Sequence, residues 1–203
     1  ATFTDHLGFY GASGPRWLYG NTGAAFALDS YRHKNPIDGK HNAAFISTTL
    51  IKVTENRLKF DNGSTVGAAN NSVFAVYVKA VSNPCRIQFF TNTTANGRVV
   101  FNLITNNVFK EIANDFAEVQ DVGIDGWKKL IWKPSNNFNY QAWNIHIRSS
   151  ADDEARNGGS GGGSGTNEFY IYGPQVQRAS AVTPYIPSTD EYTNRQSNAT
   201  FVD

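Results

Sequence analysis

Short segments in which apolar and polar residues alternate run along most of this 203-residue chain. The clearest segment is VFAVYVKAV from Val73, in which Phe74, Val76 and Val78 fall on one face and Tyr77 falls on the other. A period of two residues is that of a β-strand with one face buried in a core. Such segments recur to about residue 172, and no stretch has a convincing helical period over four turns. The pattern predicts an all-β chain.

Turn-forming residues separate the alternating segments. Ser82-Asn83-Pro84, Asn96-Gly97 and Asp125-Gly126 are turn signals, and Asn-Gly between two strand patterns indicates a hairpin. The expected strands in this half of the chain lie within 73–81, 86–91, 98–105, 108–113, 116–122, 127–133, 140–149 and 168–173. Residues 108–117 are the place where a short helical turn fits best. Many short strands at this spacing predict a two-sheet antiparallel β-sandwich.

The domain organisation follows from the same pattern and from low-complexity segments. Residues 1–70 are expected to be an N-terminal arm with the first strands, at 45–53 and 57–60, and 11–23 are expected to be a loop or an extended arm. Residues 71–187 are expected to form the core of the sandwich, and 188–203 a C-terminal extension or linker. The Gly/Ser-rich stretch 157–166 is expected to be a flexible connection. Its central run, 158–165, fits either a natural loop or an engineered linker.

Charge and cysteine content exclude several classes of function. The chain has 18 Lys and Arg against 17 Asp and Glu, so the formal net charge is +1. No large field is therefore expected to attract nucleic acid or an anionic membrane, and the apolar runs are too short to cross a bilayer. The single cysteine, Cys85, cannot form an internal disulfide and is expected to be a small buried or loop residue.

No catalytic motif is evident in the sequence. The histidines and the cysteine lack zinc-ligand spacing, and neither a nucleophile elbow nor a phosphate-binding loop is present. No strand carries the paired carboxylates of a glycoside hydrolase, so the chain is expected to be non-catalytic. Asp152 and Asp153 are a weak calcium candidate, and a solvated loop is the alternative. No other cofactor is expected.

Four motifs in a fixed order suggest a family. They are FAVYVKA at 74–80, VFNLITNNV at 100–108 followed by GWKKL at 126–130, GTNEFYIYGPQVQ at 165–177, and TPYIPS at 183–188. Together, over about residues 70–190, they resemble the carbohydrate-binding-module-like domains of bacteriophage tail and tail-fibre proteins. The chain departs from that pattern at Lys128, Pro174 and Gln177.

The resemblance implies a jelly-roll fold in a viral structural protein, located in the virion tail or fibre and assembled in the host cytoplasm. It implies two kinds of partner: a host cell-surface carbohydrate for adhesion, and other virion subunits, with a homotrimer as one form of assembly. Neither nucleic-acid binding nor membrane insertion is expected. Within this fold Trp127 is expected to be a core anchor, and Gly173-Pro174 a bend after a strand.

Polar and aromatic residues on the faces opposite the core are candidates for sugar binding, because rings stack on sugar C–H faces while amides and charges fix hydroxyls. The faces opposite the core carry Tyr77, Asn102, Asn144, His146, Arg148, Tyr170 and Tyr172. If strands 73–81, 140–149 and 168–173 share one sheet, several of these residues line one surface. An ordinary solvated face or a subunit contact is the alternative. Trp17, Tyr19, Tyr31 and His33 form a second candidate patch. The sequence thus predicts a glycan-binding domain, with a structural connector as the second hypothesis and a polysaccharide-degrading enzyme as a distant third.

Overall fold

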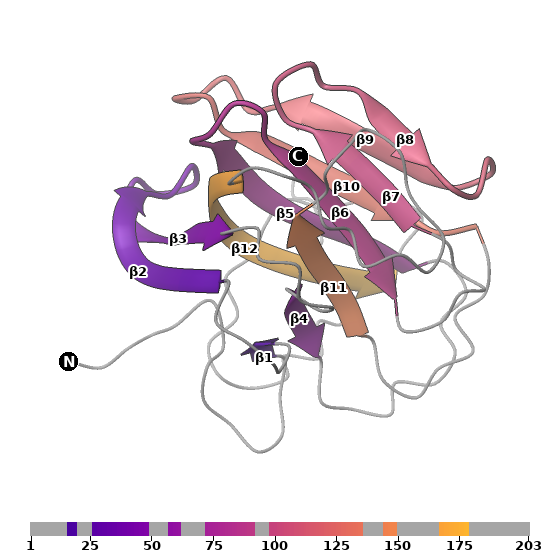
Figure 1. Cartoon of the computed structure of the whole chain (residues 1–203), viewed down its shortest axis with the longest axis horizontal. Helices are drawn as coiled ribbons and strands as arrows, with labels where there is room; N and C mark the ends of the chain where they lie inside the picture. The colour runs from indigo at the N-terminus through magenta and orange to yellow at the C-terminus, as the bar shows by residue number, and fades with distance from the viewer. Residues whose placement is uncertain are drawn as a thin grey trace, which may run out of the picture.

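The computed structural model describes residues 16–19, 26–48, 57–61, 72–91, 98–135, 144–149 and 167–178. These residues form twelve β-strands and no helix (Figure 1). The strands are β1 (Arg16–Tyr19), β2 (Phe26–Lys34), β3 (His41–Thr48), β4 (Arg57–Asp61), β5 (Ser72–Ala80), β6 (Arg86–Thr91), β7 (Arg98–Asn102), β8 (Val108–Lys110), β9 (Phe116–Asp121), β10 (Lys128–Lys133), β11 (Asn144–Ser149) and β12 (Asn167–Arg178).

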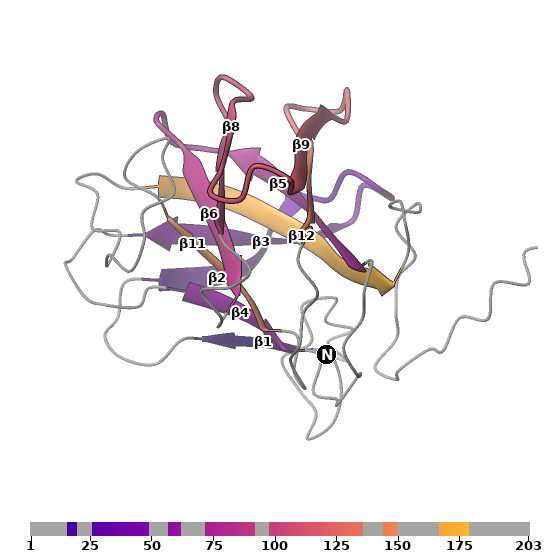
Figure 2. The same cartoon turned by 90° about the vertical axis from the view of Figure 1, so that its right-hand side faces the viewer.

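The strands make two six-stranded sheets in which every neighbouring pair is antiparallel. Sheet A has the order β1-β4-β11-β6-β7-β8, and sheet B has the order β2-β3-β12-β5-β10-β9. The two views of the chain show the sheets as two layers (Figure 2). The predicted all-β architecture with two antiparallel sheets is confirmed.

The main core lies between the sheets and is built by the alternation seen in the sequence. Phe74, Val76 and Val78 on β5 are buried in one cluster with Phe89 on β6 and Phe101 on β7. The rings of Phe74 and Phe89 meet across the two sheets with their centroids 5.1 Å apart. Burial of each such side chain contributes about 1.5–3 kcal/mol, so this cluster is the main reason that the sheets hold together.

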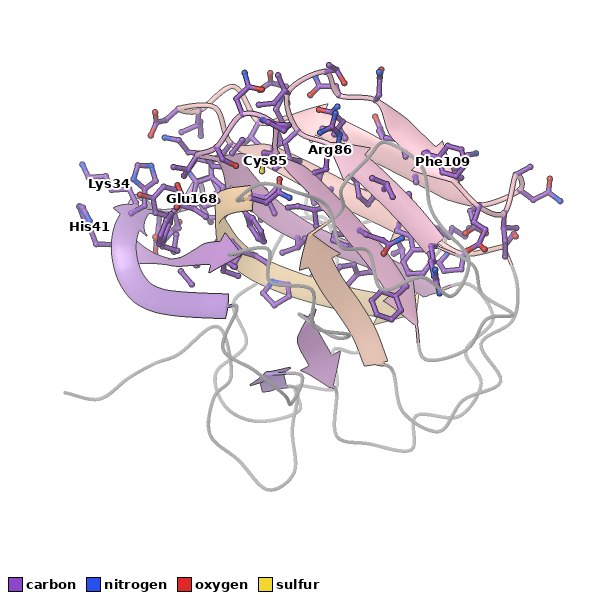
Figure 3. The ribbon with its side chains drawn as sticks, in the orientation of Figure 1. Lys34, His41, Cys85, Arg86, Phe109 and Glu168 are labelled. Atoms are coloured by element: carbon purple, nitrogen blue, oxygen red, sulfur yellow. The ribbon has the colours of Figure 1, made fainter. Side chains whose placement is uncertain are left out.

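The chain crosses from sheet B to sheet A through the loop after β5. The backbone N–H groups of Val81 and Ser82 donate to the Glu168 carbonyl at 2.8 and 3.1 Å, and the Glu168 N–H donates to Ser82 Oγ at 2.8 Å. Cys85, Arg86 and Glu168 lie close to one another at this crossing (Figure 3). Cys85 is fully buried, which confirms its expected structural role, and burial raises the pKa of its thiol to about 12. The expected turn at 82–84 is therefore an anchored junction between the sheets.

Several turns gather at one end of the two sheets, the upper left of Figure 1. His33 at the end of β2 reaches Asp125 in the β9–β10 turn, and Lys128 Nζ donates to Asn106 Oδ1 of the β7–β8 turn at 2.6 Å. Asp125 and Gly126 both have positive φ, 46° and 71°, which explains why an Asp-Gly pair stands there. The predicted turn at these two residues is confirmed.

The structure differs from the sequence prediction in several elements. β2 was not predicted as a strand, because register shifts between Asp29 and Lys34 interrupt its alternation, and β3 begins at His41, before the predicted 45–53. β1 lies within 11–23, where we expected a loop or an extended arm, because four residues at a sheet edge give too little alternation to recognise. The segment 108–117 contains β8, a turn and the start of β9. β12 continues through Gly173 and Pro174 with a shift of register between Tyr172 and Gln175, so the bend is a bulge within one strand. The predicted segments 157–166 and 188–203 lie outside the described residues.

Candidate functional site

The residues predicted to bind sugar are divided between the two sheets. β5 and β12 pair with each other in sheet B, whereas β11 pairs with β4 and β6 in sheet A. The expectation that the three strands share one sheet is therefore wrong, because an alternating pattern gives the buried face of a strand but not its neighbours. Tyr77, Tyr170 and Tyr172 belong to sheet B, and Asn102, Asn144, His146 and Arg148 belong to sheet A.

Two of the predicted tyrosines are buried on the outer face of sheet B. Tyr77 and Tyr172 are paired across β5 and β12, and their side chains are only 7% and 1% exposed. Trp127, which is 1% exposed, packs against them from the β9–β10 turn together with Ala43. Trp127 is thus a packing anchor as predicted, but it lies on the outer face and not between the sheets. Burial raises the pKa of Tyr77, and neither tyrosine presents a ring face to a ligand.

Tyr170 lies at the more open end of the same face. Its half-buried ring stacks on the imidazole of His33 with centroids 4.4 Å apart and an interplanar angle of 19°. Phe45 on β3 contacts Tyr170 from the side at 5.4 Å. Backbone pairing explains the group, because Tyr170 is opposite Phe45 on one side and opposite Lys79 on the other.

A charged triangle borders these rings. Lys79 Nζ lies 2.7 Å from Asp125 Oδ2 and 3.0 Å from His33 Nε2, and His33 Nε2 lies 3.0 Å from the same Asp125 oxygen. The hydrogen bonds from Lys79 and His33 and the charge of Lys79 hold the pKa of the Asp125 carboxyl below its usual value. We call His33, Lys79, Asp125 and Tyr170 the sheet B site.

Lys129 marks the boundary between this site and the buried part of the face. Its ammonium lies 5.5 Å from the centre of the Tyr77 ring, and partial burial lowers its pKa. Beyond it Val73, Ala75 and Ile131 are also buried on the outer face. The end of sheet B that holds His33, Lys79 and Tyr170 therefore carries both rings and charges at the surface.

Asn102 has a structural role at the end of β7. Its side-chain oxygen accepts the backbone N–H groups of Ile104 and Thr105 at 3.0 and 3.1 Å, and the residue is buried. This is the local hydrogen bonding by which asparagine stabilises a turn. Asn102 is therefore engaged in the β7–β8 turn.

The other three predicted residues of sheet A are placed by their backbone pairing. Asn144 pairs with Asp61, His146 pairs with Lys59 and Phe90, and Arg148 pairs with Arg57 and Gln88. Ile147 pairs with Phe89, which faces the core. Because alternate residues of a strand belong to opposite faces, Asn144, His146 and Arg148 stand on the outer face of sheet A.

The second predicted patch is also divided. Trp17 and Tyr19 belong to β1 in sheet A, and Tyr31 and His33 belong to β2 in sheet B. Of these four, His33 contributes to the sheet B site. The structure brings it to Lys79 and Asp125, 46 and 92 residues away, neither of which the sequence singled out for binding.

Asp115 is a buried carboxylate that the sequence did not identify. Its two oxygens accept the Trp132 indole N–H at 2.9 Å and the Ser135 backbone N–H at 2.8 Å, and Ser135 Oγ lies 2.9 Å away. All three partners lie within β10 or just after it, so Asp115 fixes the end of that strand. Its role is structural.

Among the described residues, no group of three or more His, Cys, Asp or Glu side chains is arranged to hold a metal ion. The calcium candidates Asp152 and Asp153 lie outside those residues. The described residues also include no helix that is long and apolar enough to span a bilayer. Comparison with protein-family models finds no match, and comparison with curated proteins likewise finds no significant match.

Proposed function

We propose that this chain is a non-catalytic domain of a bacteriophage tail or tail fibre that binds glycan on the host surface. The sequence motifs between residues 74 and 188 support the virion assignment through their resemblance to such domains. We further propose a jelly-roll arrangement of the carbohydrate-binding-module type. It is supported by the way the chain alternates between the sheets, at β3–β4–β5–β6 and again at β11–β12.

The observation that carries glycan binding is the sheet B site. Tyr170 and His33 supply ring surface, while Lys79 and Asp125 supply a donor and an acceptor at the edge of those rings. Aromatic surface beside fixed hydrogen-bonding groups suits sugars, which present both C–H faces and hydroxyls. Because Lys79 and His33 hold Asp125 in place, its carboxylate loses little freedom when a hydroxyl donates to it.

A glycan array followed by titration with host lipopolysaccharide tests this proposal. We expect the folded chain to bind at least one glycan, and Tyr170→Ala to weaken that binding by about tenfold or more. Phe116→Ala is the matched control, because Phe116 is an exposed aromatic residue at the far edge of sheet B. No binding at millimolar sugar by a demonstrably folded chain would contradict the proposal, as would equal losses in the two variants.

One observation favours a connector domain as the second function. The turns at the gathered end carry four large aliphatic side chains that are 44–49% exposed: Ile37, Val81, Ile104 and Ile124. Exposed aliphatic residues on several neighbouring turns are typical of a protein contact. Light scattering tests this function, since a connector that self-assembles as a trimer gives three times the monomer mass, and a strict monomer with no virion partner argues against it.

A further inference from the structure

We propose that protonation of His33 switches the sheet B site toward acidic glycans, with Lys79 as the group that receives their carboxylate. The inference rests on the proposed function in taking the ligand to be a glycan. Its basis is one nitrogen atom of the charged triangle, His33 Nε2, which lies at the same distance from two incompatible partners.

The two partners of His33 Nε2, each 3.0 Å away, require opposite proton states of that atom. Lys79 Nζ only donates, so its hydrogen bond to Nε2 needs a lone pair there. Asp125 Oδ2 is a carboxylate oxygen that only accepts, so its hydrogen bond needs a proton on Nε2. One ring nitrogen satisfies a single one of these bonds at a time. The presence or absence of that proton therefore decides which partner His33 binds.

The charge of the triangle changes with the same proton. With a neutral imidazole, the Lys79 ammonium favours the lone pair on Nε2, and its charge balances that of the Asp125 carboxylate. Acid puts a proton on both ring nitrogens, so the imidazolium donates to Asp125 and adds one positive charge to the site. Lys79 then loses one of its two acceptors and faces a like charge.

The triangle is built so that this change occurs at the histidine. Histidine is the side chain whose charge ordinarily changes between about pH 5 and about pH 8. The lowered pKa of Asp125 keeps its carboxylate ionised throughout that range. Acidification over this range therefore converts a balanced triangle into a cationic one and leaves the carboxylate in place.

The other described groups around His33 do not oppose the exchange. Ala43 lies opposite it on β3, the Tyr170 ring stacks on it from β12, and Lys34 is paired with His41 at the next position of β2 and β3. None of these four residues carries a negative charge that would compete with Asp125 for the proton on Nε2.

The released ammonium of Lys79 suits a sugar carboxylate. Lys79 is opposite Tyr170 in the pairing of β5 with β12, so it is next to the ring on which a sugar would stack. Its side chain is only 18% exposed, and a lost acceptor there is costly unless a ligand replaces it. Proton uptake by His33 and binding of an acidic sugar should therefore favour each other.

A glycan array probed with the full chain at about pH 8 and at about pH 5 tests this coupling. The array carries sialylated glycans beside the neutral glycans of the same backbone. We expect the ratio of acidic to neutral binding to rise about fivefold or more as pH falls. A ratio that stays constant or falls would overturn the inference.

Three variants assign the effect to the triangle. His33→Gln cannot gain a charge, and Lys79→Gln lacks the receiving ammonium, so each should give the same ratio at both pH values. His41→Gln removes an exposed histidine of β3 and should keep the increase. Because the readout is a ratio within one variant, a general loss of affinity or stability does not produce the expected pattern. Loss of the increase in His41→Gln, or its survival in His33→Gln, would overturn the inference.

Nitrogen-15 NMR of the imidazole rings gives a readout without any ligand. We expect His33 Nε2 to carry no proton at about pH 8, because Lys79 donates to it, and to be protonated at about pH 5. A proton on Nε2 at both pH values would contradict the exchange of partners.

The failure of this inference is distinguishable from that of the proposed function. If the ratio does not respond to pH while Tyr170→Ala still weakens glycan binding, the inference falls and the proposed function stands. If no glycan on the array binds at either pH, both fall.

Discussion

The outer faces of the two sheets differ although the inner faces are alike. The outer face of sheet B is closed in its middle by aromatic packing, because Trp127 packs over Tyr77 and Tyr172. On the outer face of sheet A the buried residues include polar ones, since Gln88 and Asn102 are 3% and 5% exposed, while Phe109 at its edge is 38% exposed. The inner faces account for the fold, so the chemistry that distinguishes this sandwich lies on its outer faces.

The largest expected effect comes from removing the cover of sheet B. Trp127→Ala should lower the free energy of unfolding by about 3–5 kcal/mol, because it leaves a cavity the size of an indole above the two buried tyrosines. Urea denaturation followed by tyrosine fluorescence and circular dichroism measures the change.

Phe109→Ala is the matched change on sheet A, since Phe109 is paired with Val100 on the outer face and partly exposed. It should lower the free energy of unfolding by about 1 kcal/mol or less. Equal losses in the two variants would mean that the two outer faces are equally closed, and the comparison would then fail.

A change inside the molecule should have an intermediate effect. Asp115→Ala leaves the Trp132 indole N–H and the Ser135 backbone N–H without their acceptor, which should cost about 2–3 kcal/mol. Ser135→Ala removes one hydrogen bond from an exposed residue and should cost under about 1 kcal/mol. If chemical denaturation gives the reverse order, Asp115 is not the group that fixes the end of β10.

The smallest expected effect concerns the charged triangle of the sheet B site. The pKa of Asp125 lies below its usual value of 3.8, so its ion pair stabilises the fold above about pH 4 and loses that contribution as pH falls through the lowered pKa. Lys79→Gln removes the largest cause and should raise the pKa of Asp125 toward 3.8. Carbon-13 NMR of the carboxyl group measures it, and an unchanged pKa in Lys79→Gln would mean that Lys79 does not hold this carboxylate.

Much of the fold could be predicted from the sequence because strand periodicity is local. The inner set of Phe74, Val76 and Val78, and the turn at Asp125-Gly126, both follow from a few adjacent residues. β1 was missed because a four-residue edge strand carries too short a pattern, and β2 was missed because register shifts interrupt its alternation.

The sites could not be predicted in the same way because they depend on which strands pair. His33 is 46 positions from Lys79 and 92 positions from Asp125 in the sequence, and only the folding of the chain makes them neighbours. Tyr77 was expected on a solvated face, but it is buried because Trp127 packs over that face from the β9–β10 turn. The alternation within a strand does not reveal that a residue from a distant turn covers it.

The most direct test of the account is an NMR titration of the isotopically labelled chain with the glycan that binds most tightly in the array. We predict that the amide signals of His33, Lys79 and Tyr170 shift, while those of Val73 and Ile131 in the closed part of the same face stay in place. Shifts confined to sheet A would contradict the assignment of glycan binding to the sheet B site.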